Sequence, residues 1–401
     1  MITREMNDRL TQVSPGTPMG NLVRRYWHPV GTVDDLDRDP VQPVRLMGED
    51  LVLFRDEAGR LGLVSNRCAH RGISLAYGIP QENGLRCAYH GWTYNQQGQV
   101  VDMPFEPACL PLKITAYPVQ ELGGLVFAYL GPEPAPLLPR WDLLVREDLD
   151  KVVDVTPLAC NWLQCVDNAL DPVHFEHLHG VFGNYFLKKL GRPPGMVPAR
   201  HVKIEFDVFE YGVAKRRLLE GESEENNDDW EVGHPILFPH ILAVGAQRRP
   251  TLQVRVPVDD EHTIQFAYRT VERAPGAEPK PFKTVHTSLF DADGRVQADN
   301  IPNQDMLAWV AQGPIADRAA HHQATSDKGI MLFYNLLLEQ IARIERGEDP
   351  LGVIRDPAQN EPMIKIARER QNNSGFQVKY PDYFAQISGQ QPVGTGERAS
   401  R

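Results

Sequence analysis

The sequence of 401 residues has few cysteines and no long apolar run. It contains no stretch of roughly eighteen apolar residues, so no membrane-spanning helix is expected. The N-terminal segment MITREMNDRL is polar and lacks the apolar centre of a signal peptide. The expected compartment is therefore the cytoplasm, where Cys109, Cys160 and Cys165 would be free thiols rather than disulfides.

Long basic stretches are also absent. The formal net charge is −11 and the longest basic run is KRR at 215–217, so a nucleic acid is not an expected partner. No G-x-G-x-x-G follows a predicted strand and no plant-type ferredoxin cysteine run is present, so a fused reductase module is not expected. The acidic run EGESEENNDD at 220–229 is most simply a solvated loop, with a mobile lid as the alternative.

The chain is long enough for two domains. From about residue 30 to 135, short β-type runs are separated by turn signals, which predicts a small antiparallel β domain. The Pro-rich stretch GPEPAPLLPRW at 131–141 ends this domain and is a predicted linker. We place the boundary after residue 145, which gives a first domain of residues 1–145 and a second of residues 146–401.

The second domain begins with helical text over 160–170. Asp171-Pro172 then starts a second short helix, which is expected to stop at Gly180. Strand-like runs return between about residues 200 and 290, and helices are expected near 303–312 and 325–346. The predicted fold class is therefore α+β, with an antiparallel sheet and helices before and after it.

Two segments of the first domain each combine a cysteine with a histidine. They read Cys68-x-His70 and Cys87-x-x-His90, with sixteen residues between His70 and Cys87. A Cys2His2 zinc site usually groups its cysteines in one pair and its histidines in the other. A [2Fe–2S] cluster with two cysteines on one iron and two histidines on the other suits a loop that supplies one of each. The order of the four residues therefore favours the cluster.

Three histidines and two aspartates lie close together in the second domain: Asp167, Asp171, His174, His177 and His179. Two histidines and one carboxylate are the ligand set of non-haem Fe(II) oxygenases. In a regular helix His174 lies about 60° from His177 and about 140° from His179, which favours the first pair. The helix is short, however, and its last residue can leave the helical spiral, so helical geometry leaves both pairs open.

Both segments resemble those of a known family. C-x-H-R-G and C-x-x-H-G-W resemble the Rieske motif. The pattern N-W-x-Q-x-x-[DE]-N-x-x-D-x-x-H-x-x-x-x-H at 161–179 resembles the catalytic segment of Rieske non-haem iron oxygenases, particularly the phthalate-dioxygenase-like group. The segments at 17–31 and 303–330 are similar to that group as well.

This resemblance implies roles for individual residues. His174, His179 and Asp305 would bind a mononuclear Fe(II), with Asp317 as the alternative carboxylate. Asp171 would hydrogen-bond both an iron-ligand histidine and a cluster histidine across a subunit boundary. His177 would then lie either behind the iron ligands or at the surface, and Asp167 stands where many members have Glu. From the residues alone, Asp317 and Arg318 are expected to form an ion pair.

The resemblance also implies a fold and a function. It implies a Rieske domain joined to a catalytic domain with a helix-grip-like antiparallel sheet, in a cyclic homotrimer. The implied protein is a terminal oxygenase that takes electrons from a separate reductase or ferredoxin and uses O2 to hydroxylate or O-demethylate a small aromatic substrate. A carboxylate on that substrate would need a basic side chain, and one of the adjacent residues Arg216 and Arg217 should face inward. A Rieske electron carrier and a zinc-binding structural protein are the alternatives.

Overall fold

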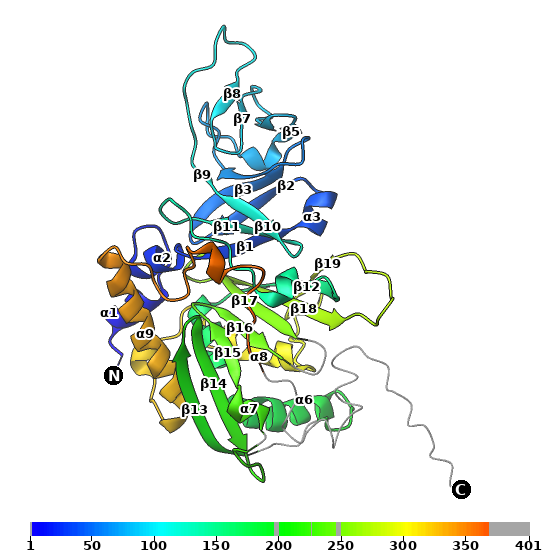
Figure 1. The fold of residues 1–401 in the computed structure, drawn as a ribbon, viewed down its shortest axis with the longest axis vertical. Helices are drawn as coiled ribbons and strands as arrows, with labels where there is room; N and C mark the ends of the chain where they lie inside the picture. The colour runs from blue at the N-terminus through cyan, green and yellow to red at the C-terminus, as the bar shows by residue number, and fades with distance from the viewer. Residues whose placement is uncertain (1, 196–199, 226, 246–249, 369–401) are drawn as a thin grey trace.

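The computed structural model describes residues 2–195, 200–225, 227–245 and 250–368. Figure 1 shows an elongated molecule with a small part made mainly of β-strands at one end and a larger part, built on one long sheet, at the other. Within this described part of the chain, no helix is both long and apolar enough to cross a membrane.

Three small sheets form the β part, and all their strand pairs are antiparallel, which confirms the predicted β domain. β2 and β3 are joined by a two-residue turn at Met47 and Gly48, both at positive φ, as a type I′ hairpin requires. The strands are β1 (Trp27–Thr32), β11 (Leu125–Tyr129) and β10 (Val119–Leu122); β2 (Val41–Leu46), β3 (Glu49–Arg55), β4 (Leu61–Ser65) and β9 (Ala116–Tyr117); and β5 (Ile79–Gln81), β6 (Gly84–Arg86), β7 (Thr93–Tyr94) and β8 (Val100–Asp102).

A single eight-stranded sheet forms the larger part. Neighbouring strands are antiparallel except for β12 and β19, which are parallel at the edge. The predicted α+β class with an antiparallel sheet is thus confirmed. In spatial order the strands are β13 (His201–Phe209), β14 (Gly212–Leu219), β15 (His234–Leu237), β16 (Ile241–Val244), β17 (Thr251–Pro257), β18 (Thr263–Glu272), β12 (Leu149–Leu158) and β19 (Lys283–His286).

The helices that matter for the site pack against this sheet. The longest, α9, has an apolar face of Phe333, Leu337, Ile341 and Ile344, whose spacing of three and four residues places them on one side. The helices are α5 (Trp162–Leu170), η2 (Phe175–Phe182), α6 (Gly183–Lys189), α8 (Ile301–Val310) and α9 (Lys328–Glu345), with the shorter α3 (Val33–Arg38), α4 (Asp142–Val145) and α7 (Asp228–Glu231) and the 3-10 turns η1 (Leu75–Tyr77), η3 (Arg318–Ala320), η4 (Thr325–Asp327) and η5 (Pro357–Gln359).

Two helical predictions need correction. The helix after Asp171 does not stop at Gly180, because η2 and α6 continue it to Lys189. Gly180 lies inside this helix and is buried, so its small size fits a packed position rather than a helix end. α8 begins at Ile301, two residues before the predicted start near 303, with Asn300 as its N-cap and Pro302 in its first turn, so Asp305 lies inside the helix.

Both ends of the described chain pack against segments that are distant in sequence. The N-terminal helices α1 (Arg4–Thr11) and α2 (Pro18–Val23) lie beside α9, and Arg9 forms an ion pair with Glu345. Near the other end, the Asn360 side chain donates to Leu138 O and accepts from Arg140 N–H. The Pro-rich 131–141 segment is therefore held by the C-terminal residues, and the two parts of the molecule are fixed to each other at this point.

Candidate metal centres

The two Cys/His segments form loops with the same backbone hydrogen bonds. In residues 68–73, the first N–H donates to the sixth carbonyl at 3.0 Å and the fifth N–H donates to the first carbonyl at 2.9 Å. In residues 87–92 the same two bonds measure 2.8 and 3.1 Å. The fifth residue is Gly72 or Gly91, each at positive φ, where a residue with a Cβ would be strained. The two loops are thus equivalent turns.

The four side chains of these loops divide into a buried pair and an exposed pair. Cys68 and Cys87 are buried, whereas His70 and His90 are exposed with ring centroids 4.4 Å apart. Desolvation and the neighbouring His70 and Arg71 lower the pKa of His90, which favours the neutral imidazole that binds a metal. The set fits a [2Fe–2S] cluster with the thiolate-bound iron inside and the imidazole-bound iron at the surface.

Two aromatic side chains support these loops. The Tyr94 hydroxyl lies 3.1 Å from Cys68 Sγ and accepts a hydrogen bond from the Ala69 N–H at 2.9 Å. Because Ala69 supplies a proton to this oxygen, the hydroxyl hydrogen is free to point to the sulfur. Trp92 stacks on the ring of His70 with a centroid distance of 4.7 Å and an interplanar angle of 8°. Trp92 belongs to the second loop and His70 to the first, so this stacking joins the two loops.

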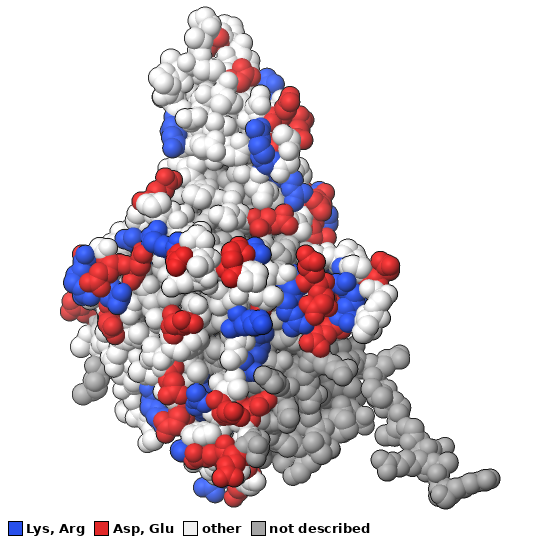
Figure 2. Space-filling model, in the orientation of Figure 1, with Lys and Arg blue, Asp and Glu red and all other residues white. Residues whose placement is uncertain are grey.

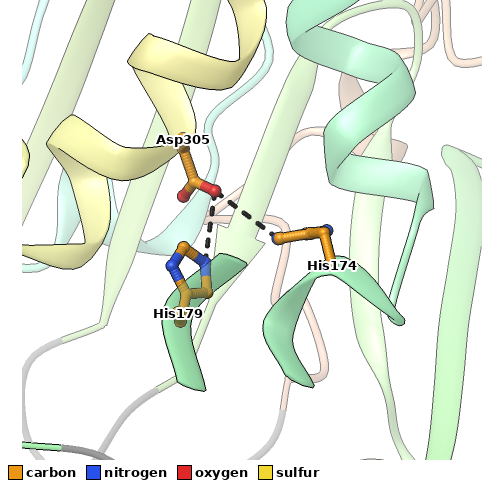
Figure 3. Close-up of side chains that lie close together, drawn as sticks. All are labelled: His174, His179 and Asp305. Atoms are coloured by element: carbon orange, nitrogen blue, oxygen red, sulfur yellow. Dashed lines mark ion pairs between the residues drawn. The ribbon is translucent and has the colours of Figure 1, made fainter. Parts of the chain in front are cut away.

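The second group lies on η2, on its N-cap residue His174 and on α8. One ligand atom from each of His174, His179 and Asp305 lies within 4.8 Å of the others. Asp305 Oδ1 is 3.2 Å from His179 Nε2 and 3.5 Å from His174 Nε2, and Figure 3 shows the carboxylate directed at both rings. This is a two-histidine, one-carboxylate set, the ligand type of non-haem iron sites.

The winding of η2 explains why residues five apart meet. η2 is π-helical, with hydrogen bonds from residue i to i+5, so residues five apart lie one above the other. His174 and His179 therefore face the same way, and their ring centroids are 5.2 Å apart. His177 points outward and is 68% exposed. The expectation that the last residue leaves a regular spiral is wrong: the whole segment is wound more loosely.

Hydrogen bonds orient the three side chains. Gln304 Oε1 accepts from His179 Nδ1–H at 2.9 Å, while Gln304 Nε2 donates to Ala298 O, which fixes the amide. His179 Nε2 faces Asp305 and is the ring nitrogen left to bind a metal, while Asp305 acts to raise the pKa of this imidazole. Burial acts to raise the pKa of Asp305, but His179, His174 and the Asn168 amide outweigh it and hold the pKa below its usual value. The carboxylate is therefore ionised.

Asp171 lies beside His174. Its Oδ1 accepts a hydrogen bond from Val173 N–H at 2.8 Å, and its Oδ2 is 3.6 Å from His174 Nδ1. His174 Nδ1 is buried and has no hydrogen-bond partner within the described ranges. Both residues line a cavity of about 580 Å³ that also reaches the exposed His321 and His322. Asp171 and His174 thus share one cavity, which also contains exposed side chains.

Asp317 and Asp167 have other positions. Asp317 is exposed and its carboxylate accepts from Ala319 N–H at the start of η3, away from the two histidines. The expected ion pair between Asp317 and Arg318 is wrong, because Arg318 Nη2 donates to Asp167 Oδ2 at 2.7 Å. Tyr334 O–H donates to the same oxygen at 2.8 Å. Asp167 therefore ties α5 to η3 and α9 and is not part of the group formed by His174, His179 and Asp305.

The strand β14 carries the predicted substrate arginines. Arg216 is half-buried and its Nε donates to Asp207 Oδ2 at 2.5 Å. Arg217 is buried, so one of the two does face inward as predicted. Its Nε donates to Asp229 Oδ2 at 2.8 Å. Asp229 belongs to the acidic run predicted to be a solvated loop, and that prediction is wrong here, because Asp229 is only 1% exposed.

Family comparisons agree with the two-part structure. Residues 26–118 match the family described as Rieske [2Fe-2S] domain, and residues 292–366 match the family described as LigXa C-terminal domain like. The first match spans both Cys/His loops and the second spans Asp305. A Rieske [2Fe–2S] domain excludes the zinc interpretation of the first domain.

Three relatives are similar over most of their length. The chain is 39% identical to the 5,5'-dehydrodivanillate O-demethylase oxygenase subunit of Sphingobium sp., covering 92% of this chain and 88% of that one. It is 37% identical to the phenoxybenzoate dioxygenase subunit alpha of Ectopseudomonas oleovorans, with 86% and 87% covered. It is 31% identical to the phthalate 4,5-dioxygenase oxygenase subunit of Pseudomonas putida, with 88% and 89% covered.

A solved structure has the same fold. The terminal oxygenase of carbazole 1,9a-dioxygenase from Novosphingobium sp. KA1 is 19% identical and superposes with a TM-score of 0.60, covering 83% of this chain and 97% of that one. The chain belongs to the family of oxygenase (alpha) subunits of Rieske oxygenases. The interpretation as an oxygenase is confirmed over the electron-carrier alternative.

Proposed function

We propose that this oxygenase subunit hydroxylates or oxidatively O-demethylates an aromatic carboxylate with O2. Its electrons come from a separate reductase or ferredoxin. The observation that carries the proposal is the convergence of His174, His179 and Asp305 in a chain of this family.

The proposed metal ligands follow from the two geometries. Cys68, His70, Cys87 and His90 hold the [2Fe–2S] cluster, and His174, His179 and Asp305 hold a mononuclear Fe(II). When both groups are bound, the cluster supplies electrons and the iron supplies the site of O2 activation. The chain's own contribution is orientation: Gln304 holds the ring of His179, and Asn168 Nδ2 donates to Asp305 Oδ1 at 3.3 Å.

A homotrimer would bring the two centres together. Within one chain the cluster loops and α8 lie in opposite parts of the molecule (Figure 1). We propose that the cluster end of one copy docks at the cavity beside Asp171 and His174 of the next, where Asp171 bridges a ligand histidine of each centre. The cluster end suits burial, because it shows few charges on the face in Figure 2 and carries several exposed apolar side chains: Tyr77, Ile79, Tyr89, Val101, Phe105, Leu110 and Leu112.

The domain division belongs to the same proposal. Residues 1–145 would be the Rieske domain with its N-terminal segment, and residues 146–401 the catalytic domain. The matched Rieske range of 26–118 and the eight-stranded sheet that starts at β12 support this division.

The substrate class rests on the relatives and on basic residues. The names of the three relatives above contain dehydrodivanillate, phenoxybenzoate and phthalate, which are all aromatic carboxylates. The sequence proposed Arg216 and Arg217 as substrate residues. Arg217 lies nearer the mononuclear site, since its guanidinium is 4.6 Å from the centre of the Phe175 ring, which is itself 5.6 Å from the ring of His179, but its charge is already paired with Asp229.

Metal analysis of anaerobically purified protein tests the proposal. About three irons and two acid-labile sulfides per chain are expected, with the low average g-value of a mixed His/Cys cluster after dithionite reduction. Reduced holoenzyme should then convert phthalate, phenoxybenzoate or 5,5'-dehydrodivanillate in the presence of O2. Two irons per chain that Fe(II) addition does not raise to three would contradict the mononuclear site.

A further inference from the structure

Three consecutive basic residues on β14 differ in what surrounds them. Side chains alternate along a strand, so Lys215 and Arg217 share one face and Arg216 has the other. Lys215 and Arg217 are 6% and 5% exposed, whereas Arg216 is half-buried and bonded to Asp207. The inner face of β14 thus carries two buried cations.

Arg217 already has its counter-charge. Asp229 accepts from its Nε at 2.8 Å, and the other oxygen of Asp229 lies 3.2 Å from His234 Nε2. The guanidinium also lies over the ring of Phe175. This arginine is therefore neutralised and fixed within the protein, and a substrate would have to displace Asp229 to bind it.

Lys215 has no such partner. Across the described ranges, its ammonium has no carboxylate within ion-pair distance and no hydrogen bond. The charges that act on it besides Arg217 and Asp229 are those of Asp171 and Asp305. Asp305 faces the two histidines, and Asp171 accepts from Val173 N–H. Fe(II) at Asp305 would further reduce the negative charge that Lys215 feels.

A buried charge without a partner lowers stability, and proteins keep one mainly where a ligand supplies the opposite charge. Lys215 is two residues from Arg217 on the same face, and Arg217 contacts Phe175, which packs on His179. We propose that Lys215 binds the carboxylate of the aromatic substrate and thereby sets its orientation toward the mononuclear site. This inference rests on the proposed function and assigns the recognition of the anion to the lysine rather than to either arginine.

Anaerobic calorimetry on the holoenzyme tests the assignment. The probes are phthalate, phenoxybenzoate and 5,5'-dehydrodivanillate, each compared with its methyl ester, which keeps the ring and removes the charge. In Lys215→Met, the acid that binds the wild type is expected to bind about ten-fold more weakly or worse, while the ester binds as before. Lys203→Met is the matched control, because Lys203 is an exposed lysine on β13 paired with Glu224. It should change neither affinity.

Two outcomes would overturn the inference, and each differs from a failure of the proposed function. If the Lys215→Met variant keeps the wild-type preference for the acid over the ester, another group binds the carboxylate. A wild type that binds none of the three acids, or binds their esters equally well, shows that the pocket does not select an anion. The proposed function itself fails only if the wild type lacks the third iron or converts no aromatic substrate.

Discussion

The cluster loops and the mononuclear site differ in how the chain assembles them. The cluster ligands lie on two turns, and the two backbone hydrogen bonds in each turn join the same relative positions. The mononuclear site instead combines η2 with α8. Gln304, whose side chain orients His179, is 125 positions further along the chain. The histidines of the loops are exposed, whereas His179 is buried.

This difference has a physical consequence for each centre. A local loop is set by its own glycines and turn bonds, so its ligands remain close together when the rest of the molecule changes. The mononuclear site depends on the packing of α5, η2, α8 and β14, and on buried polar groups that must all be paired. Removal of one side chain from the mononuclear site should therefore disturb that site and leave the cluster loops unchanged.

Asp305→Ala should produce the largest effect. Loss of the carboxylate leaves two histidines, which are too few to hold Fe(II) firmly, so turnover should fall to background. Iron should drop from about three to about two per chain while the visible spectrum of the cluster is unchanged. Asp317→Ala is the control and should keep all three irons, since Asp317 is exposed. Loss of iron in Asp317→Ala instead would exchange the roles of the two aspartates.

Asp171→Asn should slow turnover by about 10- to 100-fold with both metals retained. The amide keeps the size of the side chain but loses the charge beside His174 Nδ1. Oxidation of the reduced cluster during a single turnover is the step to follow, because electron transfer between copies should be the slowed event. A wild-type rate would remove Asp171 from the proposed path.

Asp229→Asn should destabilise the catalytic part by about 3–5 kcal/mol, because it leaves the Arg217 charge buried without a partner. Burial acts to raise the pKa of Asp229, but Arg217 and His234 hold it far below its usual value. The pair's contribution to the free energy of unfolding is therefore complete above the pKa of Asp229 in the unfolded chain. It is lost as the pH falls toward the pKa of Asp229 in the folded chain. Urea unfolding at pH 7 measures the loss.

Asp207→Asn is the matched control for this pair. Asp207 on β13 pairs with Arg216, which lies on β14 next to Arg217 but on the opposite face. This pair is more exposed, so replacement of Asp207 should cost less than about 1 kcal/mol of stability. Equal losses for the two variants would mean that the buried pair is not distinguished by its environment.

Two buried histidines should make the fold sensitive to mild acid. Burial lowers the pKa of His28 to about 4 and that of His240 well below 6.5, and His240 Nε2 lies 3.0 Å from His28 Nδ1. The unfolded chain then binds more protons than the folded chain below about pH 6.5. Stability should fall by about 1.4 kcal/mol per pH unit per histidine as the pH decreases from about 6.5 to 5.

The double variant His28→Gln/His240→Gln tests this cause. Its unfolding free energy, measured by urea at pH 7 and at pH 5, should depend less on pH than that of the wild type. An unchanged slope would assign the acid sensitivity to other groups.

Tyr94→Phe should produce the smallest effect. Its hydroxyl can donate to Cys68 Sγ, and a hydrogen bond to a ligand sulfur stabilises the more negative, reduced cluster. Loss of one such bond, worth about 1 kcal/mol, should lower the reduction potential by about 40 mV. Redox titration of the visible spectrum measures the shift, and iron content should remain unchanged. A potential equal to that of the wild type would mean that the hydroxyl does not donate to the cluster.

The local parts of this protein could be predicted from its sequence. The order of Cys68, His70, Cys87 and His90 favoured a cluster over zinc, and the turn signals predicted the β domain. The resemblance added His179 and Asp305, which residue spacing alone did not select. The structure brings these two residues together with His174, and their binding of iron remains a prediction.

Three features depended on packing that the sequence does not display. The π-helical winding of η2 turns His177 outward, whereas regular helical geometry favoured it. Arg318 pairs with Asp167 rather than with its neighbour Asp317. Lys215 lies inside without a partner, although alternation along β14 could have indicated that it shares a face with Arg217.

The sequence by itself determined the turns, the alternating strands and the amphipathic helices, because each depends on residues within a few positions of one another. Only the tertiary structure decided which charges meet. Asp229, although it belongs to an acidic run, neutralises Arg217, and Asp305 lies beside His179 although its helix is distant in sequence. A buried ionised group needs a partner, and the fold selects that partner by its position in space.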